Sequence, residues 1–191
     1  AYPVKKATVK TISDESIQSA IEYSQATGSH ALLIYHKEAL VVEHYFPGYS
    51  KQHLTSTASM HKSVLALLIG IAIDQGFIKS VDQPASDFLK EWASDQRNKI
   101  TIRQMLQQSS GIDYPEFSFH PLGEWNEMVV GDNVLKITLN QAAEKQPGTE
   151  FAYNGINPQN LGLLLQRATG QRYSSYLSEN LWQYIAEEDS Y

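Results

Sequence analysis

Ser59 and Lys62 are the residues of this chain whose types and spacing most directly suggest chemistry. They open the stretch SMHKSVLALLIGIAIDQG, which is almost wholly apolar after Lys62. Residues three apart in a helix share a face, so the hydroxyl and the amine can come within reach of each other. A serine hydroxyl is a weak nucleophile until a base takes its proton, and a desolvated lysine can be that base. The pair therefore predicts an acyl-transfer centre at the start of a helix.

The spacing alone is weak evidence, because a short Ser-x-x-Lys motif also occurs by chance. The alternative interpretation is a serine N-cap followed by a solvated lysine. The chain's histidines show no metal-ligand spacing with carboxylates, and His61 is expected to point away from the face that carries Ser59 and Lys62. We therefore expect no metal and no cofactor, and further motifs have to decide between the two interpretations.

The elements around this pair begin with a predicted helix over residues 13–28, whose inner face carries Ile17, Ala20, Ile21 and Ser24. Two apolar runs, Ala31 to Tyr35 and Ala39 to Tyr45, follow at the spacing of an antiparallel hairpin, without the usual Asn-Gly turn. One helix and two strands cannot bury both faces of a sheet. This part of the chain is therefore expected to need further strands.

From residue 55 onward the pattern is helical and rich in loops. Thr101 and Gln104 have capping-box spacing at the start of a helix that Gly111 is expected to end. Later helices are predicted from about Pro158 to Thr169 and from about Ser174. The irregular stretch between these helices carries aromatic residues that could wall a substrate cleft or simply pack: Tyr114, Phe117, Phe119 and Trp125.

Four blocks of the sequence resemble, in order, motifs of one known superfamily. They are SMHKSVLALLIGIAIDQGFIKSVDQPASDFL, ITIRQMLQQSSGID, PGTEFAYNGINPQNLGLLLQRATG and YSSYLSENLWQYI. Together they are similar to the serine β-lactamase and penicillin-recognising superfamily, in its class C-like branch of esterases, peptidases and 6-aminohexanoate-dimer hydrolases. The resemblance covers about residues 30 to 191, and four ordered blocks are far more specific than one tetrapeptide.

The resemblance implies an α/β, β-lactamase/transpeptidase-like fold, in which helices flank an antiparallel sheet beside a mostly helical domain. Residues 1–54 would supply the N-terminal helix and hairpin of the α/β domain. Residues 55–191 would form the helical domain with the nucleophile helix and a tyrosine loop. The sheet would be incomplete in this chain, with the C-terminal strands of the α/β domain missing.

The resemblance also implies roles for individual residues. Ser59 falls on the family's acyl nucleophile, Lys62 on its general-base lysine and Tyr153 on its second-motif tyrosine. A phenol held near an ammonium group can lose a proton to become a base, or donate one to a leaving amine or alcohol. These residues imply a serine hydrolase that acts on a small-molecule ester or amide through an acyl-enzyme.

The candidate substrate-binding residues are Tyr114, from the aromatic stretch, and Asn154 and Asn157, from the block that contains Tyr153. The family's second motif is Tyr-x-Asn, whereas this chain reads Tyr153, Asn154 and Gly155. The amide that often holds a β-lactam side chain or the lysine is therefore displaced or absent, which favours the esterase or amidase branch over β-lactamase activity.

The family's third motif, Lys-Thr-Gly or a His-Gly-Gly-like equivalent, lies on a late strand that also supplies one oxyanion-hole amide. The chain ends at Tyr191 before any such strand. We therefore expect a partner, either the C-terminal remainder of the same protein or a second fragment, to complete the sheet. The remaining alternative is a non-catalytic, penicillin-binding-like fragment or an interaction protein.

Composition narrows these function classes. The 191 residues are 42% hydrophobic and 19% charged, which is typical of a globular protein. A formal net charge of -6 with 15 Lys and Arg disfavours a nucleic-acid partner, and with it a helical nucleic-acid or regulatory module. The longest apolar run, Val64 to Ile73, is too short to span a membrane. A periplasmic or secreted location is favoured over the cytoplasm.

Overall fold

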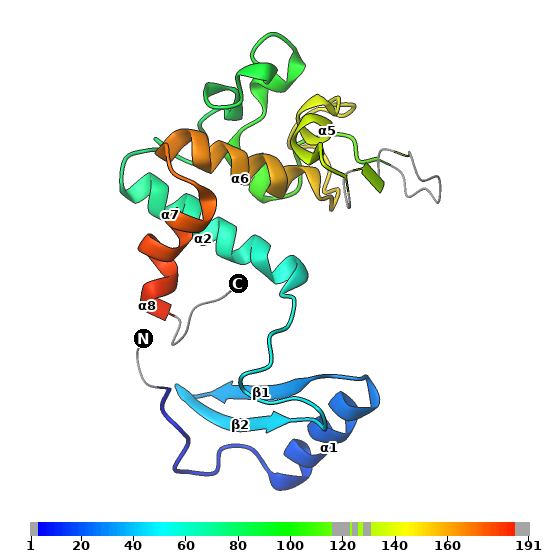
Figure 1. Ribbon diagram of the computed structural model, residues 1–191, viewed down its shortest axis with the longest axis vertical. Helices are drawn as coiled ribbons and strands as arrows, with labels where there is room; N and C mark the ends of the chain where they lie inside the picture. The colour runs from blue at the N-terminus through cyan, green and yellow to red at the C-terminus, as the bar shows by residue number, and fades with distance from the viewer. Residues whose placement is uncertain (1–3, 116–122, 124–125, 128–130, 186–191) are drawn as a thin grey trace. The chain divides into compact units, whose positions relative to one another are not determined.

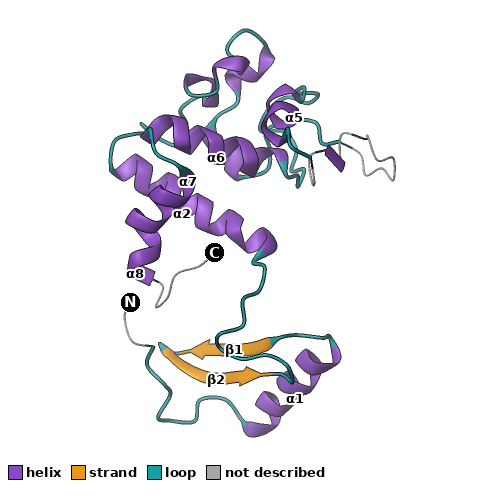
Figure 2. Cartoon of the chain, in the orientation of Figure 1, coloured by secondary structure: helices purple, strands orange, loops and turns teal. Residues whose placement is uncertain are grey.

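The computed structural model of this chain describes residues 4–115, 123, 126–127 and 131–185 (Figure 1). The chain divides into two compact units, Ala1–Thr57 and Ala58–Tyr191. Figure 2 shows that both strands of the sheet belong to the first unit, whereas the second unit is built from helices and loops. Each unit is described by itself below.

The first unit contains helix α1 (Asp14–Ala26), which confirms the helix predicted over residues 13–28. The Ser13 side chain accepts a hydrogen bond from the Ser16 backbone N–H, so the start of the helix is capped. Gly28 follows the last turn with φ of 72°, a left-handed conformation that glycine adopts without steric cost. The predicted inner face is the partly buried face of this helix.

Strands β1 (Ala31–His36) and β2 (Ala39–Tyr45) form an antiparallel hairpin, as predicted. Lys37 and Glu38 connect them with φ of 50° and 61°, and two positive values are those of a type I′ turn. This turn twists in the sense that neighbouring strands require, so the hairpin forms without the usual Asn-Gly sequence. Within the described residues the sheet has only these two strands.

The second unit is organised around helices α2 (His61–Asp74) and α6 (Ile156–Thr169), which pack against each other (Figure 1). Both helices contribute fully buried aliphatic side chains to one core. The main ones are Leu68 and Ile69 from α2, and Leu164 and Leu165 from α6. Burial of apolar area on this scale holds the two helices together.

Shorter elements complete this unit. They are α3 (Ile102–Leu106), α5 (Val134–Asn140), α7 (Tyr173–Leu177), a π-helical turn at Ser178–Trp182, α8 (Gln183–Ile185), and 3₁₀ turns at Ala58–Met60, Ala85–Asp87, Lys90–Trp92 and Gln96–Lys99. The predicted helices that start near Pro158 and Ser174 are therefore present as α6 and α7, with slightly earlier starts. The longest helices of the unit have 14 residues, and no helix in the described ranges is long and apolar enough to cross a membrane.

Helix α3 confirms the predicted capping box, since the Thr101 side chain accepts from the Gln104 backbone and the Gln104 side chain accepts from Thr101. The expectation that Gly111 ends this helix is wrong, because α3 ends at Leu106. Gly111 instead lies against the backbone of Lys145, and a Cβ atom there would come within 2.2 Å of the Lys145 carbonyl oxygen. The glycine therefore permits a close approach of two chain segments.

Candidate active site

Three of the predicted site residues meet at one oxygen atom. The Lys62 ammonium donates a hydrogen bond of 2.9 Å to the Ser59 hydroxyl oxygen, and the Tyr153 hydroxyl donates one of 2.7 Å to the same atom. The Lys62 nitrogen also lies 5.0 Å from the centre of the Tyr153 ring. Ser59 and Tyr153 are 94 residues apart in the chain, so tertiary folding brings them together. All three belong to the second unit.

The start of α2 positions Ser59 and Lys62. Ser59 lies in the 3₁₀ turn Ala58–Met60 that leads into the helix, and Lys62 occupies its first turn. No side chain caps the N-terminus at Met60, and the first turn contains no acidic residue. The backbone N–H groups there therefore keep their positive potential, which favours a developing oxyanion.

Ala58 reaches this turn with φ of 43°, a left-handed conformation that is costly for a residue with a Cβ atom. Such backbone conformations persist only where the surrounding structure imposes them, and they are frequent at functional sites. The strained residue directly precedes Ser59. The backbone that leads into Ser59 therefore passes through a strained conformation.

The groups around Tyr153 change the pKa of its phenol. The hydrogen bond to Ser59, together with the Lys62 side chain nearby, lowers the pKa of the Tyr153 phenol below its usual value. A neighbouring positive charge and hydrogen bonds both stabilise a phenolate relative to the neutral phenol. The group stays open to solvent, with 58% of Tyr153 exposed. Tyr153 is thus placed to exchange a proton with Ser59.

Asn154 and Asn157, predicted to bind substrate, are buried with exposed fractions of 3% and 0%. The side-chain oxygen of Asn154 (Oδ1) accepts hydrogen bonds from the backbone N–H groups of Ile156 and Asn157, and so it caps the first turn of α6. The Asn157 amide nitrogen donates to Asn154 and to Gln108. Both amides bind groups of the protein itself, and a direct contact with substrate stays a prediction.

Tyr114, the third predicted substrate-binding residue, is half-buried beside the Tyr153 loop. Its ring lies against Gly155, where a Cβ atom would come within 3.4 Å of the Tyr114 hydroxyl oxygen. A Cβ atom there would make an ordinary van der Waals contact, so the Tyr114 ring lies directly beside the third position of the Tyr-x-Asn motif. The other members of the predicted aromatic cluster, Phe117, Phe119 and Trp125, lie outside the described residues.

Gln108 was not predicted from the sequence, although it contacts the loop on both sides of Tyr153. It accepts hydrogen bonds from the backbone N–H groups of Ala152 and Asn154. Gln108 lies among other polar residues in QQSSG, and no spacing or composition in that stretch distinguishes it. Only the tertiary contacts identify it.

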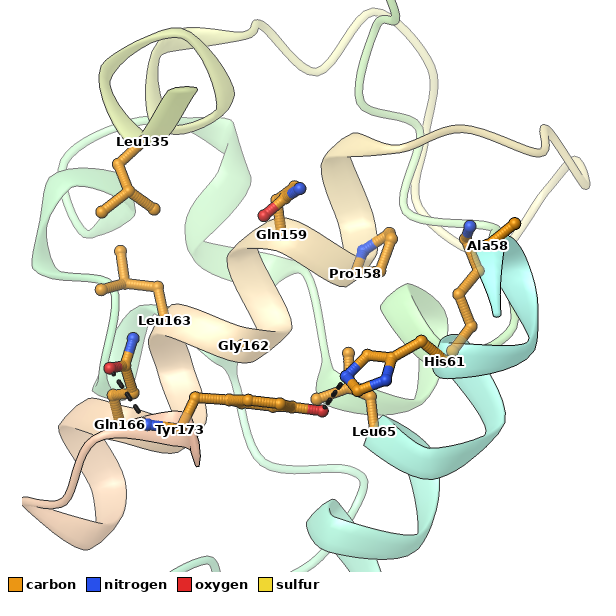
Figure 3. A pocket seen from close by; sticks show the side chains of 11 residues that line it. Ala58, His61, Leu65, Leu135, Pro158, Gln159, Gly162, Leu163, Gln166 and Tyr173 are labelled. Carbon is orange, nitrogen blue, oxygen red and sulfur yellow. Dashed lines mark hydrogen bonds between the residues drawn. The ribbon is translucent and has the colours of Figure 1, made fainter. Parts of the chain in front are cut away.

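A cavity of about 400 Å³ includes Lys62, one of the three catalytic candidates, in its lining. Figure 3 shows the side chains that surround it. Lys62 and Leu65 of α2 form one wall, and Pro158, Gly162 and Leu163 of α6 form the opposite one. Its lining combines apolar side chains with amide, imidazole and phenol groups and the Lys62 amine, so the cavity is partly apolar and partly polar.

His61 also lines this cavity, and its Nε2 atom lies 2.7 Å from the Tyr173 hydroxyl oxygen (Figure 3). Burial raises the pKa of Tyr173 to about 12, so this phenol keeps its proton at neutral pH. His61 therefore contacts Tyr173 and not Ser59. This agrees with the expectation that His61 points away from the face that carries Ser59 and Lys62. Among the described residues no three His, Asp or Glu side chains gather as a metal site would require.

Comparison with solved structures defines the class of this fold. A candidate beta-lactamase from Bacteroides dorei DSM 17855 matches with a TM-score of 0.74 at 23% identity, covering 91% of this chain and 52% of that one. The octameric penicillin-binding protein homologue from Pyrococcus abyssi matches with a TM-score of 0.67 at 22% identity, covering 90% and 43%. The chain has the β-lactamase/transpeptidase-like fold, with a sheet that is not closed within the described residues.

Sequence comparison identifies the family. The Beta-lactamase family model matches residues 12–185, and the chain belongs to this family. A relative, the 6-aminohexanoate-dimer hydrolase of Paenarthrobacter ureafaciens, is 27% identical over 168 residues, which are 83% of this chain and 43% of that protein. The chain thus spans less than half the length of this curated relative.

Proposed function

We propose that this protein is a serine hydrolase that forms an acyl-enzyme on Ser59 from a small ester or amide. Lys62 acts as the general base, and Tyr153 carries a proton between the serine and the leaving group. The observation that supports this proposal best is the meeting of Lys62 and Tyr153 at the Ser59 hydroxyl oxygen, at 2.9 and 2.7 Å. Membership of a family with hydrolases among its named relatives supports it independently.

The reaction would begin with attack of the Ser59 oxygen on the substrate carbonyl carbon, while its proton passes to the Lys62 amine or to a Tyr153 phenolate. The tetrahedral intermediate would then expel an alcohol or an amine, which takes a proton from Tyr153 or Lys62. Water would attack the resulting ester carbonyl, release the carboxylic acid and return the proton to Ser59. Hydrogen bonds of normal length connect the three residues, as such proton transfers require.

An ester or linear amide fits this site better than a β-lactam. The third position of the second motif is Gly155, which has no side-chain amide, and the neighbouring Asn154 amide is turned into the protein. The relative from Paenarthrobacter ureafaciens is named for hydrolysis of a 6-aminohexanoate dimer. We therefore place linear amides beside short-chain esters as substrate classes.

The alternative is a non-catalytic member of the family that binds a partner or ligand. It would keep the same fold and the same three residues, with Ser59 acting only as a helix-start residue. The two functions differ in whether the Ser59 oxygen reacts with an electrophile. An activated serine is acylated or phosphonylated by suitable probes, and a capping serine is not.

The test is the mass of the protein, in its natural full length, after incubation with a fluorophosphonate probe. We expect one adduct, absent from Ser59→Ala and retained in Ser63→Ala, which removes an exposed serine of the same helix. A parallel incubation with a penicillin separates β-lactam recognition from general esterase reactivity. A wild-type protein that gains no mass with either probe would favour the non-catalytic alternative.

We further propose that strands outside this chain complete the sheet of the first unit. Within the described residues β1 pairs only with β2, so its other edge is open, and an open edge invites further pairing. Leu33 and Tyr35 on the face of β1 are 57% and 63% exposed, so apolar surface there also lacks a cover. The C-terminal remainder of the same protein, or a second fragment, would supply these strands and the third motif. Purified protein that runs as a single 21.5 kDa species, monomeric and in solution, would contradict this proposal. The periplasmic or secreted location stays a prediction.

A further inference from the structure

Gln108 accepts three hydrogen bonds, and two of them come from the residues on either side of Tyr153. Its backbone carbonyl accepts the Ala152 N–H at 2.8 Å, and its side-chain oxygen accepts the Asn154 N–H at 3.3 Å. The same side-chain oxygen accepts from the Asn157 amide at 3.0 Å. The residues immediately before and after Tyr153 are thus both bound to one residue that is far from them in sequence.

We propose that Gln108 is the positioning residue for Tyr153, and that it sets the place of the phenol relative to Ser59. The inference rests on the function proposed above only for its consequences in catalysis. Tyr153 is largely exposed, so packing against its ring cannot fix its position. The backbone that carries it must do so, and Gln108 holds that backbone on both sides.

The base of this clamp is rigid. The Gln108 backbone N–H donates to the Met105 carbonyl at the end of α3, so the residue is tied to that helix. Helix α3 is itself fixed in the core, because Ile102 and Met105 are fully buried. Close-packed interiors have low compressibility, so a helix anchored by such side chains has little room to shift. Gln108 therefore connects the loop that carries Tyr153 to the core of the second unit.

The backbone conformation of Gln108 indicates that surrounding contacts hold the residue in place. Its φ is 56°, in the left-handed region that residues other than glycine rarely adopt. This conformation brings both the carbonyl and the side-chain oxygen of one residue to the same loop. A strained conformation persists where the surrounding contacts require it, and here the contacts lie at a candidate site.

The side-chain half of the clamp depends on Asn157. The side-chain oxygen of Asn157 (Oδ1) is buried without a hydrogen-bond partner within the described residues. Its amide nitrogen, bound to Gln108 and Asn154, is therefore what orients this side chain. Removing the Gln108 side chain leaves the Asn154 N–H without its acceptor and weakens this orientation, so the Tyr153 loop gains freedom.

Two variants test the proposal in the natural full-length protein. Gln108→Gly removes the side chain and relieves the left-handed backbone, so it is expected to fold. Gln108→Met keeps the length of the side chain and removes its acceptor. Gln107→Met is the matched control, because Gln107 is the exposed neighbour of the same residue type.

We expect both Gln108 variants to lower kcat for a nitrophenyl ester about 10-fold or more, with KM changed less than about threefold. A displaced proton carrier lowers turnover, whereas loss of a substrate contact would raise KM. The control is expected to match the wild type in both constants. Unchanged kcat in folded Gln108→Gly would overturn the proposal.

A second measurement does not depend on activity. Titration of the Tyr153 ring carbon in ¹³C-tyrosine NMR spectra reports the pKa of its phenol. In the Gln108 variants we expect this pKa to move toward its ordinary value, because the phenol leaves Ser59 and Lys62. If the wild type is never labelled by the fluorophosphonate probe, the proposed function fails, and this titration still decides the role of Gln108. A Tyr153 titration identical to wild type in both variants would refute it.

Discussion

The two sides of the candidate site are held in different ways. Ser59 and Lys62 lie one turn apart at the beginning of α2, so the helix itself brings them together. Tyr153 lies in a loop before α6, where it contacts Ser59, and the backbone of that loop is bound by Gln108 and Asn154. One side is built from local geometry, and the other is built from hydrogen bonds between distant segments.

This difference has consequences for how each side responds to substitution. Changes on the α2 side remove reacting groups and leave the helix, which is stabilised by its buried aliphatic side chains, in place. Changes on the loop side alter buried hydrogen bonds, so they are expected to affect stability and activity together. The following substitutions test this contrast, from the largest expected effect to the smallest.

The largest effect is expected from Ser59→Ala. Loss of the nucleophile should lower kcat for a nitrophenyl ester by about 10⁴-fold or more. The free energy of unfolding, measured by urea denaturation, should change by less than about 0.5 kcal/mol because Ser59 is exposed. Turnover that stays near the wild-type value would mean that another residue is acylated.

Lys62→Met should lower kcat by about 10²- to 10⁴-fold, the range typical of a general base. It should also raise the pKa of Tyr153, because the nearby ammonium favours the phenolate, and its removal favours the neutral phenol. The phenol pKa can be followed by NMR titration, with Lys90→Met, at an exposed lysine, as the control. A Tyr153 pKa that falls in Lys62→Met would contradict the electrostatic account.

On the loop side, Asn154→Ala should reduce the free energy of unfolding by about 2 kcal/mol. The substitution removes the cap of α6 and leaves two buried backbone N–H groups without an acceptor. We expect kcat to fall as well, since Tyr153 is the adjacent residue. Asn98→Ala, at an exposed asparagine, should change stability by less than about 0.5 kcal/mol. Equal stability of the two variants would show that the cap is unimportant.

The smallest effect on activity is expected from Thr101→Ala. Loss of the capping box should cost about 1 kcal/mol of stability. Because Thr101 caps the start of α3 and Gln108 follows its end, kcat of the folded protein should stay unchanged. Thr101→Ser, which keeps the hydroxyl group, should retain most of the stability. A strong fall in kcat would mean that the whole of α3, and not Gln108 alone, positions the loop.

Local features of the fold were predictable because they depend on neighbouring residues. Helix α1, the hairpin and the capping box at Thr101 all formed where sequence patterns placed them. The end of α3 was predicted wrongly, because Gly111 serves a contact with Lys145 from a distant segment. A glycine needed for local helix termination and one needed for close approach look the same in a sequence.

The sequence by itself determined that Ser59 and Lys62 share a helix end, because a spacing of three residues fixes that geometry wherever a helix forms. It also contained the ordered blocks by which the family could be recognised. Only the tertiary structure decided that Tyr153 meets the Ser59 oxygen, that Asn154 and Asn157 are turned inward, and that Gln108 holds the loop. The Tyr153–Ser59 contact joins residues 94 apart in the chain, and the side-chain contacts of Gln108 with Asn154 and Asn157 join residues 46 and 49 apart. Hydrogen bonds over such separations follow no local pattern.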